Sequence, residues 1–183
     1  MRPVICAFGT LLCALLPSLP AADLTVVLSF EAHHAARSVA QMRLEAERLL
    51  LDSGVSLDWR MLNDLPPGES FSRLAVVKFT GQCEMTAFPS GPTAPVAPLG
   101  ITYRIAGRVV PFSQVACDEV RATLAAAHLP ADPEIRELLY GRALGRVLAH
   151  ELFHVLNGNG RHTHSGVTQK YLSAASLIGA HIN

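Results

Sequence analysis

The chain has 183 residues, half of them apolar, and its 15 basic residues balance its 15 acidic residues. This length suits one domain with a packed core. Because the sequence has no basic patch and no run of like charges, it argues against nucleic acid or an acidic polymer as a partner.

Residues 1–22 are typical of a secretory signal peptide. A basic residue near the start is followed by an apolar stretch over residues 4–16, and cleavage is expected after Ala21 or Ala22. An uncleaved anchor is the alternative, but the stretch is short for a membrane span. We therefore predict a secreted or periplasmic protein in which residues 23–183 form a single domain, with no stable membrane span after cleavage.

Two cysteines, Cys83 and Cys117, remain in the predicted mature chain. In an oxidising compartment such a pair most simply forms one disulfide, and two buried thiols are the alternative.

The mature chain shows a series of strand and helix patterns, interrupted by a proline-rich stretch at 86–99. This stretch has no periodicity, which predicts a loop. The predicted strands lie at 24–30, 55–62, 74–80, 101–105 and 109–112, and the predicted helices at about 34–52 and 114–128.

A last, long helix is predicted from Pro133 to about residue 156. Asp132 suits its N-cap, proline suits the first helical position, and Asn157-Gly158 suits its end. Gly141 and Gly145 lie within it and weaken it, so we expect them to permit a close approach of this helix to the sheet.

This last helix contains the H-E-x-x-H motif His150-Glu151-Leu152-Phe153-His154. Residues four apart share one helical face, so His150 and His154 can bind one metal ion, and Glu151 can reach a water on that metal. The alternative is a solvated polar face. The apolar residues that flank the motif favour a buried helix, in which such polar groups need partners.

The motif resembles that of the zincin metallopeptidases, whose metzincin branch continues as H-E-x-x-H-x-x-G-x-x-H. Here Asn157 stands at the glycine position, Gly158 follows, and the next histidine, His162, comes two residues late. Either residue can make the turn, since asparagine tolerates left-handed backbone.

His162 and His164 both remain candidates for a third ligand. The stretch His162–Val167 resembles the ending of small exported bacterial zincin-like proteins, in which a histidine lies four residues before a glycine. That resemblance favours His162. Residues 99–103 and 107–117 also resemble that group.

The resemblance implies an α+β, zincin-like fold: a mixed β-sheet, a long N-terminal helix and a buried H-E-x-x-H helix. It further implies Zn²⁺ held by His150, His154 and His162, with Glu151 as the general base that activates water for hydrolysis of a peptide or protein substrate. We expect a monomer. The alternative function is a non-catalytic zincin-like module that binds a metal or a peptide.

Overall fold

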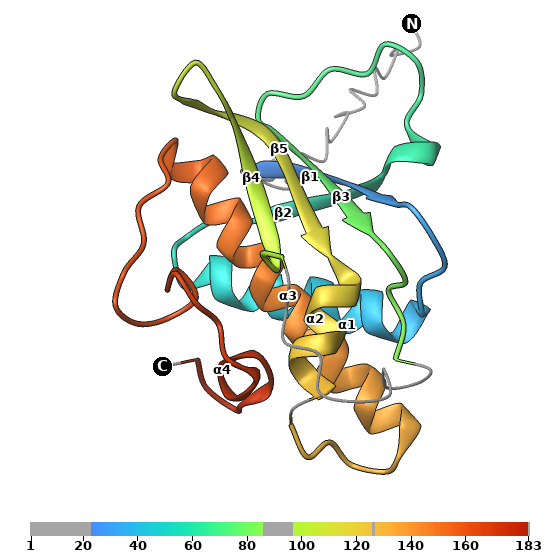
Figure 1. Cartoon of the computed structure of the whole chain (residues 1–183). Coiled ribbons are helices and arrows are strands. Elements are labelled where there is room, and N and C mark those ends of the chain that lie inside the picture. The colour runs from blue at the N-terminus through green and yellow to red at the C-terminus, as the bar shows by residue number, and fades with distance from the viewer. Residues whose placement is uncertain (1–22, 86–96, 126, 183) are drawn as a thin grey trace, which may run out of the picture.

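The computed structural model describes residues 23–85, 97–125 and 127–182, which form an α+β structure around a five-stranded mixed sheet (Figure 1). The predicted signal peptide and residues 86–96 of the predicted loop lie outside the described residues. In chain order the elements are β1 (Leu24–Phe30), α1 (Ala36–Leu51), β2 (Leu57–Met61), the 3₁₀ turn η1 (Leu62–Asp64), β3 (Leu74–Thr80), β4 (Gly100–Ile105), β5 (Arg108–Ala116), α2 (Cys117–Ala125), α3 (Pro133–Asn157) and α4 (Ala174–Ile178).

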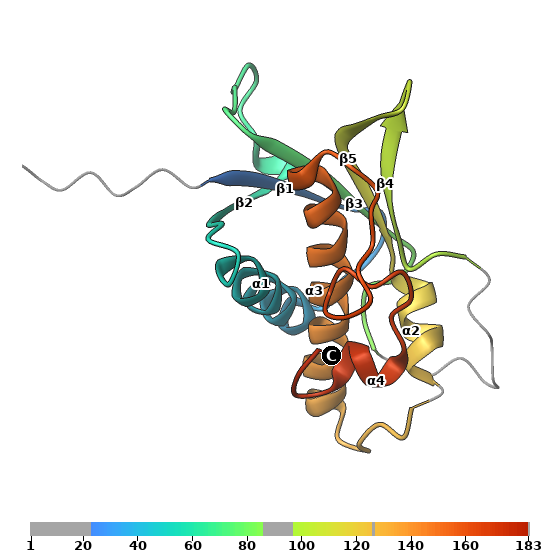
Figure 2. The ribbon, with the colours of Figure 1, turned by 90° about the vertical axis from the view of Figure 1, so that its left-hand side faces the viewer.

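The sheet has the order β2-β1-β3-β5-β4. Its first four strands run parallel, and β4 pairs antiparallel with β5 at the edge. The apolar run of β1 lies next to the centre, where Val26 and Leu28 are fully buried. Figure 2 shows α1 and α3 on the same side of the sheet.

A tight turn joins β4 and β5. Its two central residues, Ala106 and Gly107, have φ values of 49° and 79°. Two consecutive left-handed residues let a two-residue hairpin follow the twist of its strands. The short strands that the sequence predicts on either side of this turn are therefore one hairpin.

The predicted helix over 114–128 is wrong at its start, because residues 114–116 belong to β5 and α2 begins at Cys117. Val115 pairs with Phe79 of β3, and both side chains are fully buried. This pairing with a distant strand overrides the local helical pattern.

The glycines of α3 bring it close to α1, and the expectation of an approach to the sheet is wrong. A Cβ at Gly141 would lie 2.5 Å from the Ser38 carbonyl oxygen, and one at Gly145 would lie 2.7 Å from the Met42 carbonyl oxygen. Any side chain at these positions would separate the two helices. The cost of glycine in a helix is offset by this contact.

A buried ion pair crosses the same helix interface. Arg146 of α3 is fully buried, and its Nε donates to Oε1 of Glu45 on α1 at 2.7 Å. Its two terminal nitrogens donate to the carbonyl oxygens of Ser176 and Gly179, at 2.5 and 2.8 Å. Arg146 therefore holds the C-terminal segment around α4 against the helix that carries the metal motif.

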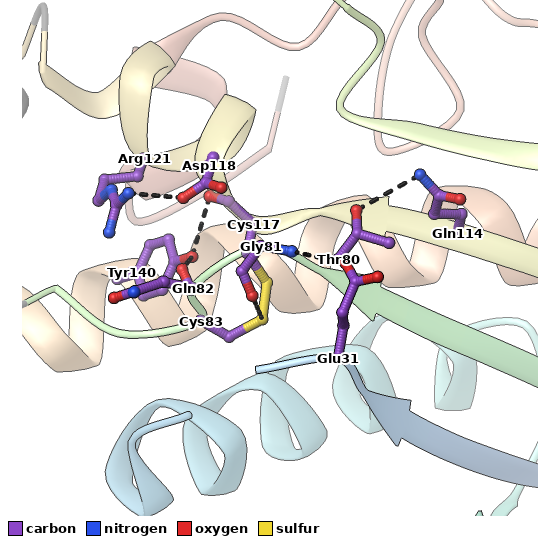
Figure 3. Close-up of a disulfide and its surroundings, with 10 residues drawn as sticks. All are labelled: Glu31, Thr80, Gly81, Gln82, Cys83, Gln114, Cys117, Asp118, Arg121 and Tyr140. Atoms are coloured by element: carbon purple, nitrogen blue, oxygen red, sulfur yellow. Dashed lines mark hydrogen bonds and ion pairs between the residues drawn. A yellow bond between two sulfur atoms is a disulfide. The ribbon is translucent and has the colours of Figure 1, made fainter. Parts of the chain in front are cut away.

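The predicted disulfide between Cys83 and Cys117 is present (Figure 3). It joins the segment after β3 to the first residue of α2, with Cα atoms 5.1 Å apart. The hydroxyl of Tyr140 on α3 donates to the Cys117 carbonyl oxygen at 3.0 Å. The cross-link is therefore tied to the motif helix as well.

Among the residues that the structure describes, no helix combines the length and the apolar character that crossing a membrane requires.

Candidate metal centre

The long helix α3 presents His150, Glu151 and His154 from its last two turns. The Asp132 side chain caps its start by accepting from the backbone N–H of Glu134 at 2.8 Å. Its last residue is Asn157, and Gly158 follows with a left-handed φ of 62°. Of the two residues that could make the turn, the structure thus uses the glycine, because it has no Cβ to oppose this backbone.

The loop after Gly158 brings His162 to the two helical histidines. Its ring centroid lies 5.2 Å from that of His150 and 4.9 Å from that of His154. One potential ligand atom from each of the three residues lies within 4.8 Å of the others, and His164 is not in this group. The first two rings are buried and His162 is exposed.

Backbone carbonyls orient the two buried rings. Nδ1 of His150 lies 2.8 Å from the Val167 oxygen, and Nδ1 of His154 lies 3.0 Å from the Asn159 oxygen. A carbonyl only accepts, so each Nδ1 carries the proton and each neutral ring has a bare lone pair on Nε2. Metal-binding histidines usually donate their other ring N–H to a carbonyl or carboxylate oxygen in this way.

The two Nε2 atoms face each other at 3.1 Å. Two lone pairs at this distance repel unless a cation lies between them. Nitrogens bound to one tetrahedral zinc at 2.0–2.1 Å are about 3.3 Å apart. The donor set therefore fits a metal ion, and three imidazoles leave one position of a tetrahedral zinc open.

The electrostatic setting keeps the buried imidazoles neutral. Burial lowers the pKa of His150 to about 4; the neighbouring His154 and His162 act in the same direction, against the hydrogen bond to Val167. Burial also lowers the pKa of His154. Neutral imidazole is the form that binds a metal, so at neutral pH no proton has to be displaced.

Glu151 is 3% exposed, and none of the described residues gives it a cationic partner. Its Oε2 accepts from the Thr102 hydroxyl of β4 at 2.5 Å. Burial raises its pKa to about 7, against the opposing effect of that hydrogen bond. A carboxyl group with this pKa can both accept and release a proton near neutral pH.

Two residues beside Glu151 were missed by the sequence reasoning. Thr102 holds one carboxyl oxygen, and Gly100 leaves room for the other, since a Cβ there would lie 2.5 Å from Oε1. The stretch that contains both residues was noted for its resemblance to exported zincin-like proteins. No local pattern links it to a residue about fifty positions later, so only the folded chain shows the contact.

The centre lies in the wall of a cavity of about 670 Å³. Its walls come from the edge strand β4, the end of α3, the loop around His162, and residues 169–172. Tyr171, which is 77% exposed, also belongs to this wall.

The other histidines lie apart from the triad. His33 contacts Glu84 at 2.6 Å, the ring of His34 stacks on Phe30, and His128 and His181 are exposed.

Comparison of the chain with models of known protein families, with curated proteins and with solved structures gave no match.

Proposed function

We propose that this protein is an exported, zinc-dependent hydrolase of the zincin type, most simply a monomeric peptidase that acts on a peptide or protein. One observation carries the proposal. Three imidazoles meet, two of them with bare Nε2 atoms that face each other, next to a buried glutamate that is bound by the Thr102 hydroxyl, in the wall of an open cavity. A purely structural zinc site is closed by four protein ligands and does not need the glutamate.

Two further features support the proposal. The mixed sheet with an antiparallel edge strand beside the motif helix suits the zincin-like architecture. The Cys83–Cys117 disulfide suits an oxidising compartment outside the cytosol.

His150, His154 and His162 would hold the metal. Zinc in such a site acts as a Lewis acid toward a carbonyl and makes water acidic enough to lose a proton near neutral pH. Glu151 would accept that proton on Oε1, because its Oε2 is engaged by Thr102. It would then donate the proton to the nitrogen of the departing amine, which leaves the carboxylate ready for another cycle.

The decisive experiment compares wild type with Glu151→Gln in zinc-loaded, full-length mature protein. The variant should keep its zinc and its fold and lose roughly 10²- to 10⁴-fold in peptide hydrolysis, the usual contribution of a general base. Glu69→Gln, in an exposed turn, is the matched control and should cut like wild type. Equal inertness of wild type and Glu151→Gln across broad peptide libraries, with zinc bound in both, would instead support the binding module.

The ligands are tested by metal content. His162→Ala should lower zinc affinity far more than His164→Ala, because only His162 reaches the two helical rings. Elemental analysis after dialysis against a weak chelator measures the difference. Equal losses, or full retention of zinc in His154→Ala, would contradict the assignment.

A further inference from the structure

An arginine from the edge strand lies beside the metal centre. Arg104 of β4 lines the same cavity as the three histidines. Its Nη2 donates to the Gly107 carbonyl oxygen at 2.9 Å, and its Nη1 is 3.3 Å from where a Cβ at Gly160 would lie. The guanidinium thus reaches from the β4–β5 turn to the loop that carries His162, and the glycine leaves it room.

This arginine places a positive charge near the metal ligands. It lines the cavity together with His154 and His162. Among the residues that the structure describes, no carboxylate forms an ion pair with Arg104. The one acidic side chain among the described residues lining the cavity is Glu151, which is bound to Thr102.

A fixed cation next to a site for a dication is unfavourable on its own, since like charges repel across a short distance. An anion between the two would offset this repulsion. Guanidinium groups bind carboxylates through paired hydrogen bonds, and Arg104 has donors left after its single bond to Gly107.

The cavity is also asymmetric along β4. Arg104 lies near Gly160, beyond the end of α3, whereas the apolar Leu99 and Val147 line the other end of the cavity. Lys170 is a second cation in the cavity wall. Thr102 and Glu151 lie between these ends, because Val147 precedes Glu151 by one helical turn. A substrate that crosses the centre would therefore meet apolar wall on one side and positive charge on the other.

We propose that Arg104 binds a carboxylate of the substrate, so that the protein selects anionic peptides with an apolar group on the opposite side of the scissile bond. This inference rests on the proposed hydrolase function. The carboxylate can belong to an acidic side chain or to the C-terminus of the peptide.

Binding of short peptides tests the inference without depending on turnover. Four N-acetylated peptides combine glutamate or glutamine inside the sequence with a free or an amidated C-terminus. They are titrated calorimetrically into zinc-loaded Glu151→Gln protein, in which the peptides should persist. At least one anionic form should bind roughly 10- to 100-fold more tightly than the neutral peptide, the range of a charge-assisted pair. The peptide that shows the gain identifies the source of the carboxylate.

Arg104→Gln in the same background should abolish this preference, so that anionic and neutral peptides bind with about equal affinity. Arg108→Gln removes an identical charge from the same hairpin but outside the cavity, so it should leave the preference intact. Equal binding of neutral and anionic peptides by the parent protein, or equal effects of the two variants, would overturn the role of Arg104.

Zinc affinity gives a second readout. Without peptide and at low salt, Arg104→Gln should bind zinc several-fold more tightly than the parent protein in chelator competition, because a repulsive charge is gone. Arg108→Gln should change it less. An unchanged affinity in Arg104→Gln would contradict the proposed repulsion. Failure of the hydrolase proposal is separately visible as a wild type that cuts no peptide while the charge-dependent binding persists.

Discussion

Two buried glutamates of this protein are held in opposite ways. Glu45 on α1 and Glu151 on α3 are 6% and 3% exposed. Burial alone raises the pKa of Glu45, but hydrogen bonds from Arg48 and Arg146 outweigh it and hold the pKa below its ordinary value. Within the described part of the chain, the Glu151 carboxyl group accepts a hydrogen bond only from the Thr102 hydroxyl, and burial raises its pKa to about 7.

The comparison shows that burial by itself does not decide what a carboxyl group does. A buried carboxylate with two arginines stays ionised and fastens two helices together. A buried carboxyl group without a cation beside it has a pKa close to neutral pH, so it can take up and release a proton there. α3 contributes to both arrangements, since Arg146 and Glu151 lie five residues apart on it.

The largest expected effect comes from breaking the buried ion pair between Glu45 and Arg146. Arg146→Met should lower the free energy of unfolding by about 3–5 kcal/mol, because it removes the buried partner of Glu45 and two donors to the C-terminal segment. Urea denaturation measures this change.

Arg142→Met is the matched control for Arg146→Met. Arg142 also donates to the C-terminal segment, at Ile178, but forms no ion pair with any carboxylate of the described residues. It should cost about 1 kcal/mol. The double variant Glu45→Met/Arg146→Met should recover part of the loss. Equal losses of unfolding free energy in the two single arginine variants would show that the Glu45–Arg146 ion pair does not account for the loss.

A smaller and sharper test makes the same substitution at both glutamates. Glu45→Gln should destabilise the metal-free protein by about 2 kcal/mol, because Arg146 then lacks its buried counter-charge. Glu151→Gln should not destabilise the metal-free protein and should stabilise it at neutral pH, because the neutral amide removes a charge that burial disfavours and no cation loses a partner. Chemical denaturation in the presence of a chelator measures the unfolding free energy of both variants. Equal changes in the two variants would refute the distinction between the two glutamates.

Removing the hydrogen bond from Thr102 to Glu151 should affect catalysis more than stability. Thr102→Val keeps the shape of the side chain but removes the hydroxyl that holds Oε2 of Glu151. We expect kcat/KM to fall roughly tenfold, the equivalent of about 1.4 kcal/mol, with zinc retained.

Thr123→Val is the control for that experiment, because Thr123 lines the same cavity but donates to the Glu119 carbonyl oxygen instead. It should leave kcat/KM within about twofold. The same fall in both variants would point to a general change in the cavity.

The smallest effect is expected from pH. The folded pKa of Glu45 lies below its ordinary value of 4.5, so its stabilising contribution is fully present above that value. The contribution is lost as the pH falls through the lower, folded pKa. The difference in unfolding free energy between wild type and Glu45→Gln should therefore be constant from pH 6 to 7 and shrink below about pH 4.5. A difference that widens in acid would contradict the assigned direction.

Much of the local structure follows from the sequence. The strands at 24–30 and 74–80 were predicted with the bounds that the structure shows, because their apolar runs are short and clearly ended. The motif helix was predicted within a residue at its end, because Asp132, Pro133 and Gly158 are strong helix boundaries. Its glycines were noticed, but not the helix that they approach.

The sequence by itself determined the two histidines and the glutamate on one helical turn, the cysteine pair, and the preference for His162. Helical periodicity carries the first of these, the cysteine count of an exported chain carries the second, and the resemblance to exported zincin-like proteins carries the third. Only the tertiary structure decided that Thr102 and Gly100 lie beside Glu151, that Arg104 lines the cavity of the metal ligands, and that Arg146 meets Glu45. Those contacts join segments about 50 to 100 residues apart, and their pairing depends on the packing of the whole chain rather than on any local pattern.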